Sequence, residues 1–156
     1  MLKKIIIGIV VAIILGVILI QFIPVRRTNP SVTREIQWNS AETADLARRA
    51  CYDCHSNETV WPWYSKIAPV SIFVATHVDN GRQSLNFSEW DKDNKDADEA
   101  MEEIREDKMP LASYLPLHPE ADLTPAEKEA LIKGLEETYR NESTNCDQRR
   151  IRGVRQ

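Results

Sequence analysis

The sequence predicts an all-α domain that follows a single membrane-spanning helix. Nearly every residue from Ile5 to Ile23 is apolar, and a helix rising about 1.5 Å per residue makes this run just long enough to cross a hydrocarbon core of about 30 Å. Beyond it, apolar residues recur at three- and four-residue spacing, and no stretch alternates for long enough to predict a sheet. The length of 156 residues suits one small domain with appendages.

The apolar run is expected to be an uncleaved anchor over residues 1–24. A secretory signal peptide has a shorter apolar region followed by a small-x-small cleavage pattern, and the residues after Ile20 contain no such pattern. A cleaved signal is the alternative. Basic residues flank the run on both sides, so charge alone leaves its orientation open: Lys3 and Lys4 precede it, and Arg26 and Arg27 follow.

The part of the chain outside the anchor is acidic. The whole sequence has 20 Lys and Arg, 24 Asp and Glu, and a formal net charge of -4. Setting aside the four basic residues that flank the apolar run leaves 16 basic against 24 acidic residues, a net charge near −8. Nucleic acids and anionic lipids are polyanions that such a surface disfavours. DNA-binding and RNA-binding functions are therefore excluded.

The first two helices of the domain follow a polar linker over residues 25–38. Asn39 with Glu42 three residues later indicates a helix start, and this helix is expected to end near Cys51. A second helix is expected to open at Pro69, an allowed first-turn position, and to stop at Asn80-Gly81. Its apolar face comprises Val70, Phe73, Val74, His77 and Val78.

Two more helices complete the predicted domain over residues 39–140. The first covers about 97–105, and Pro110 disfavours helix at Met109 before it. Residues 110–123 contain three prolines and are expected to form loops. Thr124-Pro125-Ala126-Glu127 is a capping box with proline at the first helical position, and the inner face of this last helix carries Ala130, Leu131, Leu135 and Thr138. The polar, basic tail over 141–156 is predicted to be disordered.

The predicted apolar stripes are short for a domain of this size, which indicates that a disulfide, metal or cofactor stabilises it. Cys51-Tyr52-Asp53-Cys54-His55 is Cys-x-x-Cys-His, the c-type haem attachment motif. Its two thiols reach the two vinyl groups of haem, and the histidine that follows becomes an axial iron ligand. Haem attachment takes place outside the cytoplasm, which favours an exported domain.

Two other uses of the cysteines are weaker interpretations. A membrane-anchored thiol oxidoreductase also uses Cys-x-x-Cys, but it belongs with a βαβ pattern that the sequence lacks. A structural zinc site needs a fourth ligand, and Cys146 stands isolated in the polar tail. The role of Cys146 stays open.

The second axial ligand is expected to be Met109, which follows a helix and begins a loop that can cover the far face of the haem. His77 is the main alternative, because it lies on the apolar face of the second helix. His118 and an open site are further alternatives, whereas Met101 sits within a helical stripe and is interpreted as core. We expect the other ring nitrogen of His55 to donate to a backbone carbonyl, with Pro69 the predicted carrier.

The chain resembles the bacterial haem-binding-domain proteins, small membrane-anchored c-type cytochromes with a layout like that of class I cytochromes c. The resemblance covers about residues 38–139. It rests on the segments 51–59, 61–64, 86–90, 109–119 and 123–128. It implies a cytochrome c-like helical fold around one covalently bound haem c, with Cys51, Cys54 and His55 in the attachment motif and Met109 at the distal position.

These observations predict a non-enzymatic electron-transfer domain on the periplasmic side of the bacterial inner membrane. A haem peroxidase or a gas or redox sensor with an open distal site is the alternative. Residues 89–107 contain ten acidic and three basic residues. Such runs are mostly solvated faces, but this one also suits docking of a basic redox partner.

Overall fold

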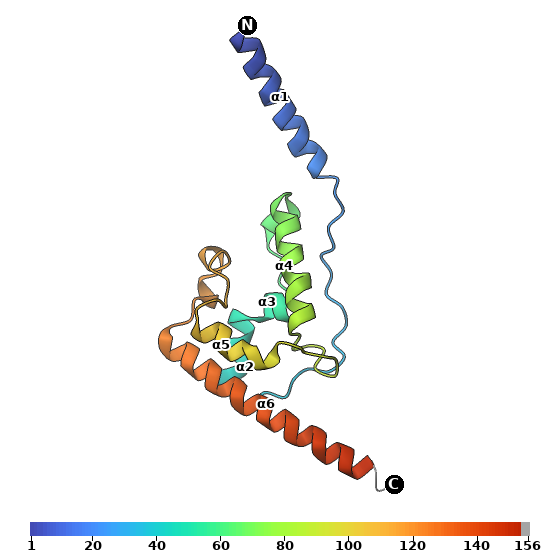
Figure 1. Cartoon of the computed structure of the whole chain (residues 1–156), viewed down its shortest axis with the longest axis vertical. Coiled ribbons are helices and arrows are strands. Elements are labelled where there is room, and N and C mark those ends of the chain that lie inside the picture. The colour runs from blue at the N-terminus through green and yellow to red at the C-terminus, as the bar shows by residue number, and fades with distance from the viewer. Residues whose placement is uncertain (154–156) are drawn as a thin grey trace.

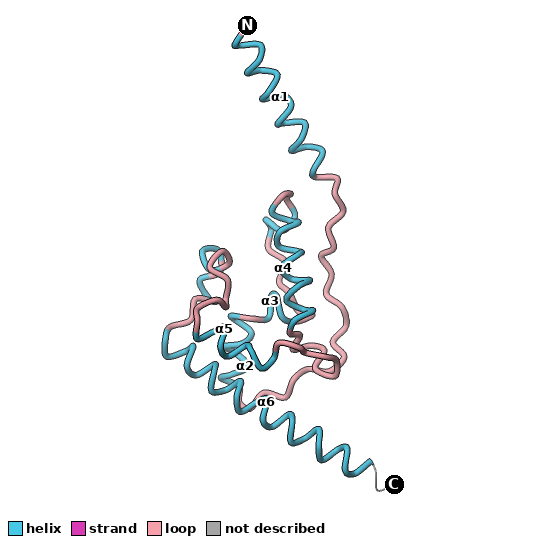
Figure 2. The backbone as a smooth tube through the Cα atoms, in the orientation of Figure 1, coloured by secondary structure: helices cyan, strands magenta, loops and turns pink. Residues whose placement is uncertain are grey.

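The computed structural model describes the backbone of residues 1–153 and the side chains as far as residue 145. All regular elements in this part of the chain are helical, which confirms the predicted fold class (Figure 2). Within the described residues, the one β-bridge is an isolated parallel bridge between Arg34 and Glu89. Cys146 lies outside the described side chains.

Helix α1 (Leu2–Ile20) stands apart from the rest of the chain (Figure 1). Its mean hydropathy is 2.7 and none of its residues is buried. By length and composition it is apolar enough to cross a membrane, as the sequence predicts.

Helix α2 (Ala41–Ala50) packs across α6 (Pro125–Gly153) in the lower part of the domain (Figure 1). The two backbones approach closely because α6 has a glycine at the crossing: a Cβ on Gly134 would lie 2.1 Å from the Thr43 hydroxyl oxygen. The start of α2 corrects the prediction, because Ser40 and not Asn39 is the N-cap and accepts from the Thr43 N–H over 3.1 Å. The Asn39 side chain instead donates to Glu137 of α6.

The remaining elements are short helices and turns, together with the longer helix α4, and they include the cysteine motif. Helix α3 (Tyr52–His55) packs on α4 (Val70–Ser84), with the short 3-10 turn η1 (Trp63–Lys66) between them in the chain. The 3-10 turn η2 (Ala97–Glu99) continues directly into α5 (Ala100–Arg105), which confirms the predicted helix over 97–105. Two further 3-10 turns, η3 (Leu115–Leu117) and η4 (Pro119–Ala121), lie within the expected loop.

The hydrophobic core lies between α2, α5 and α6. Its buried side chains include Leu46, Phe87, Ile104, Leu131 and Leu135. Trp38 and Trp90 pack on Phe87, with ring centroids 5.1 and 6.4 Å away. Tyr52 of α3 belongs to this core and Cys51 packs against it, so the cysteine motif lies at the edge of the core.

The folded domain reaches beyond both of its predicted ends. In the expected linker, Ile36 is 2% exposed and belongs to the core. At the other end α6 continues to Gly153, so the tail expected to be disordered from residue 141 is helical as far as it is described. Glu142 is buried there and accepts from the Gln37 N–H over 3.0 Å and from Arg34. The two ends therefore stabilise each other.

Candidate functional site

The cysteine motif forms a single helical turn. The carbonyl oxygen of Cys51 accepts from the N–H groups of Cys54 and His55 over 3.1 and 2.9 Å. The turn is also tied to the segment that follows it: the Asp53 carboxylate accepts from the Val60 N–H over 2.8 Å. The backbone conformation thus places two thiols and one imidazole on the same short stretch of chain.

Cys51, Cys54 and His55 all line one cavity of about 500 Å³, a size typical of ligand and cofactor sites. The face of α4 that the sequence predicts to be apolar is one wall of this cavity, and Val78 on this face is itself buried. Other walls come from η1 and from the loop that begins at Met109. A second cavity of about 310 Å³ adjoins it and shares Cys51, His55 and Met109 among its lining residues.

The imidazole of His55 is held by the end of α4. Its Nδ1 lies 3.1 Å from the carbonyl oxygen of Leu85. A carbonyl only accepts, so Nδ1 carries the proton and Nε2 is left with a free lone pair. The prediction that Pro69 carries this carbonyl is wrong, because Pro69 lies at the opposite end of the same helix. Burial lowers the pKa of His55 and favours the neutral, metal-binding form of the ring.

Gly81 corrects a second prediction and explains how α4 reaches the motif. The sequence places the end of the helix at Asn80-Gly81, but α4 continues to Ser84. A Cβ on residue 81 would lie 2.5 Å from the carbonyl oxygen of Cys54. Glycine therefore serves close helix packing here, and Leu85 reaches His55 because the helix does not stop at residue 81.

Met109 is placed at the cavity by the way α5 ends. Asp107 adopts φ 55, in the left-handed region, and its N–H donates to the Ile104 carbonyl over 3.2 Å. The Lys108 N–H donates to the Glu103 carbonyl over 2.9 Å. Together these bonds form a Schellman motif, which turns the chain sharply after the helix. Met109 follows that turn and lines both cavities.

The candidate ligands named from the sequence differ in whether they line the cavities. His77 lines the larger cavity along with Met109, and its Nδ1 donates to the Phe73 carbonyl over 2.9 Å. His118 lines neither cavity and is bonded to Tyr64 through Nε2 at 2.6 Å. Met101 also lines neither cavity and packs against the core, in agreement with its interpretation. Of the second ligands that the sequence offers, Met109 and His77 are thus the two that line this cavity.

A family model described as a haem-binding domain matches residues 15–137, from the end of α1 to the middle of α6. The chain belongs to the haem-binding domain family. No curated protein and no solved structure matches the chain. The match covers the cysteine motif, the walls of the cavity and Met109.

The residues of this haem-binding domain fit a haem. The larger cavity has an apolar wall from α4, a neutral imidazole oriented by Leu85, and a thioether on a separate loop. These are the donors that haem iron takes from proteins. The aromatic residues after the motif differ in their surroundings. Trp63 and Tyr64 line the cavity, whereas the Trp61 ring N–H donates to Asn29 over 3.1 Å.

Tyr114, which lies in a segment of the family resemblance but has no role predicted from the sequence, joins the loop after Met109 to the cysteine motif. The Tyr114 hydroxyl donates to the Asp53 carboxylate over 2.7 Å, and its ring stacks on His118 with centroids 3.8 Å apart. Burial, and then this hydrogen bond, raises the pKa of Tyr114. The loop after Met109 is thereby fastened to the motif turn. No spacing rule joins residues 53 and 114, so no signal in the sequence pointed to the pair.

Proposed function

We propose that this haem-binding domain is a membrane-anchored c-type cytochrome that transfers electrons on the periplasmic side of the bacterial inner membrane. It carries one haem c, attached through Cys51 and Cys54 and ligated by His55 and Met109. The observation that supports this best is that these four residues, from two separated segments, line one cavity.

Attachment needs only addition chemistry. Each thiol adds across one vinyl group: a carbon–sulfur bond forms, the S–H bond breaks, and the hydrogen goes to the other vinyl carbon. No atom leaves and no oxidant is consumed. Burial raises the pKa of Cys51 to about 12 and of Cys54 to about 11, so both cysteines are thiols at neutral pH.

The same raised pKa values argue against the thiol oxidoreductase. A dithiol catalyst needs a thiolate, and such enzymes lower the pKa of the attacking cysteine with nearby positive charge or a helix N-terminus. Here burial is the largest cause of the raised pKa of both thiols, and Asp53 raises that of Cys54 further; the positive charge of Arg82 lowers the pKa of Cys54 but does not offset these two effects. The environment suits two cysteines that are consumed once by attachment.

The chain's own groups set the properties of the bound haem, which supplies one-electron iron chemistry. Leu85 fixes the orientation of His55. A thioether from Met109 raises the reduction potential relative to a second imidazole from His77. The apolar wall from α4 excludes water from the iron. With His55 and Met109 both holding the iron, no position would be left for a substrate, and we propose no catalytic turnover.

The electron partner is proposed to be a basic protein. The acidic run over residues 89–107 lies on η2, α5 and the adjoining loops. Glu99 and Glu103 of this run line the smaller cavity beside the motif. Added salt should slow electron exchange with a basic cytochrome, and equal rates at low and high salt exclude this partner.

The attachment is tested by producing the full chain together with haem-maturation machinery and running a denaturing gel. Haem should stay with the polypeptide and be lost in the Cys51→Ala, Cys54→Ala double variant. Cys146→Ala is the matched control, a cysteine outside the motif, and should retain haem. If haem leaves the wild-type chain and both motif thiols can be alkylated, the c-type assignment is wrong.

A second measurement separates electron transfer from the gas-sensor or peroxidase alternative. Carbon monoxide is added to the reduced protein and the absorption spectrum is recorded. A six-coordinate site with two protein ligands should leave the spectrum unchanged. Rapid formation of a carbon monoxide complex would mean that the distal position is open.

A further inference from the structure

Four exposed apolar side chains gather around the start of α4, and we call them the apolar rim: Trp63, Ile67, Val70 and Phe73. Their exposed fractions are 73%, 50%, 43% and 52%. Large apolar side chains exposed together mark an interaction site more often than scattered ones do.

The cavity accounts for only part of this exposure. Trp63, Val70 and Phe73 line the larger cavity, so a bound haem covers some of their surface. Ile67, the C-cap residue of η1, does not line it and is half exposed. The rim therefore continues beyond the haem site onto the outer surface of the domain.

The rim lies where the anchor meets the domain. Gln21 directly follows α1, and its side-chain amide donates to the Ala68 carbonyl and accepts from the Ala68 N–H, both over 3.0 Å. Arg27 donates to the Ser65 carbonyl over 3.1 Å. The tip of α4 accordingly lies next to the end of α1 (Figure 1). Ala68 sits between Ile67 and Pro69, so these bonds place the rim beside the end of the anchor.

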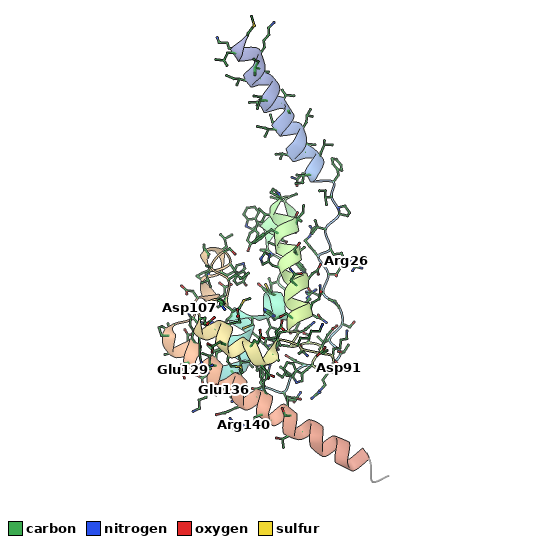
Figure 3. All side chains as sticks on the ribbon, in the orientation of Figure 1. Arg26, Asp91, Asp107, Glu129, Glu136 and Arg140 are labelled. Carbon is green, nitrogen blue, oxygen red and sulfur yellow. The ribbon has the colours of Figure 1, made fainter. Side chains whose placement is uncertain are left out.

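The charge around the rim differs from that of the whole domain. Residues 60–78 contain no acidic residue, and Lys66 is their one residue with a fixed charge. In Figure 3 the labelled Arg26 lies on the segment that leaves α1, whereas Asp91 and Glu136 lie at the far end of the domain. Asp91 and Glu136, two of the acidic residues, thus lie away from the rim, and the nearest stretch of chain has no acidic residue. Tryptophan with neighbouring basic residues is typical of the membrane interface.

We propose that the apolar rim rests in the interfacial layer of the membrane that α1 enters, so that the mouth of the haem cavity faces the lipid surface. This inference rests on the proposed membrane anchoring. Because the anchor is covalently joined and bonded to Ala68, docking is an intramolecular event with a high effective concentration of lipid. A small apolar face is therefore sufficient.

The test places a nitroxide label on the rim of the full, haem-loaded chain in phosphatidylcholine vesicles. The parent is Cys146→Ser, whose two motif cysteines are bonded to haem. Ile67→Cys puts a label on the rim outside the cavity. Val32→Cys is the matched control, an apolar residue 45% exposed next to Thr33, whose N–H bonds to Ser88 in the domain. Collision with oxygen reports lipid, and collision with a water-soluble nickel complex reports solvent.

The oxygen-to-nickel collision ratio at Ile67 should be several-fold higher than at Val32. Equal ratios at the two positions, whether both are lipid-like or both are water-like, overturn the proposal. Flotation of the vesicles tests the anchor separately, and labelling of the Cys146→Ser parent shows whether the motif thiols are free. Unchanged absorption spectra of both labelled variants show that the domain is folded around its haem.

Discussion

The Nδ1–H of His55 donates to the carbonyl oxygen of Leu85 over 3.1 Å, and Leu85 is the C-cap residue of α4. This bond joins the motif turn to the helix that forms the apolar wall of the cavity. The helix lies close enough because residue 81 has no side chain. Whatever moves α4 away from α3 is therefore expected to disturb the orientation of the His55 ring.

Replacing Gly81 with alanine should destabilise the domain and reduce haem attachment. The added Cβ would lie 2.5 Å from the carbonyl oxygen of Cys54, a backbone atom that cannot turn aside. Overpacking of this kind costs about 1–3 kcal/mol, more than the roughly 1 kcal/mol that alanine returns through helix propensity. The measurements are the free energy of unfolding in denaturant and the haem bound on a denaturing gel.

Gly16→Ala is the control for this substitution. A Cβ there meets nothing within 4 Å, and because residue 16 lies in α1, outside the domain that unfolds, neither quantity should change. An alanine at residue 81 that leaves both stability and haem content at wild-type values would show that α4 does not approach the motif as described.

The second ligand is decided by a pair of substitutions. Met109→Ala should remove the thioether and change the reduced spectrum from low spin to high spin or to a new ligand set. His77→Ala is the matched variant, a residue of α4 that lines the same cavity, and should leave the spectrum unchanged. The reverse outcome, with His77→Ala altering the spectrum and Met109→Ala silent, would assign the ligand to His77.

The sequence predicts helices best where the signal is local. Thr124 and Glu127 form the expected capping box, with the Thr124 N–H donating to Glu127 over 2.8 Å, and the next residue begins α6. The attachment motif and Met109 were likewise recognisable, since motif chemistry and chain order are local properties. The structure then places them on one cavity.

The errors come from residues whose role depends on distant partners. Gly81 looks like a helix stop, but its partner is Cys54, on another helix. Asn39 looks like a cap, but its side chain bonds to α6, 98 residues away. Glu142 looks like part of a solvated tail, yet it is buried against Arg34. Local patterns carry no information about such contacts.

Glu142 supplies a prediction about stability. Its carboxylate accepts from the Gln37 N–H over 3.0 Å and from Arg34, and the residue is 5% exposed. Glu142→Ala leaves both donors without their acceptor, which should cost about 1–3 kcal/mol in the free energy of unfolding. Glu136→Ala is the control, since it breaks an exposed pair with Arg105 worth at most about 1 kcal/mol. Equal losses in denaturant unfolding would mean that the end of α6 does not pack as described.

The capping box predicts how the stability of the domain depends on acid. Hydrogen bonds from the Thr124 N–H and from Arg49 lower the pKa of Glu127 from 4.5 to about 2. Between these values the unfolded chain binds a proton that the folded chain does not, so acid favours unfolding. The contribution of Glu127 is complete above pH 4.5 and is lost as the pH falls through this window towards about 2.

Glu127→Gln removes this titration while keeping a side chain that can cap the helix. The difference in the free energy of unfolding between wild type and Glu127→Gln should be constant above about pH 5 and should shrink towards about pH 3. Glu129→Gln, two residues further along α6, removes an exposed carboxylate outside the capping box and is the control for loss of charge alone. Because the effect depends on α6 and α2 and not on the haem cavity, it should be the same in the chain with and without haem. A difference for Glu127→Gln that stays flat across the window would show that the carboxylate of Glu127 is not bonded to Thr124 and Arg49 in solution.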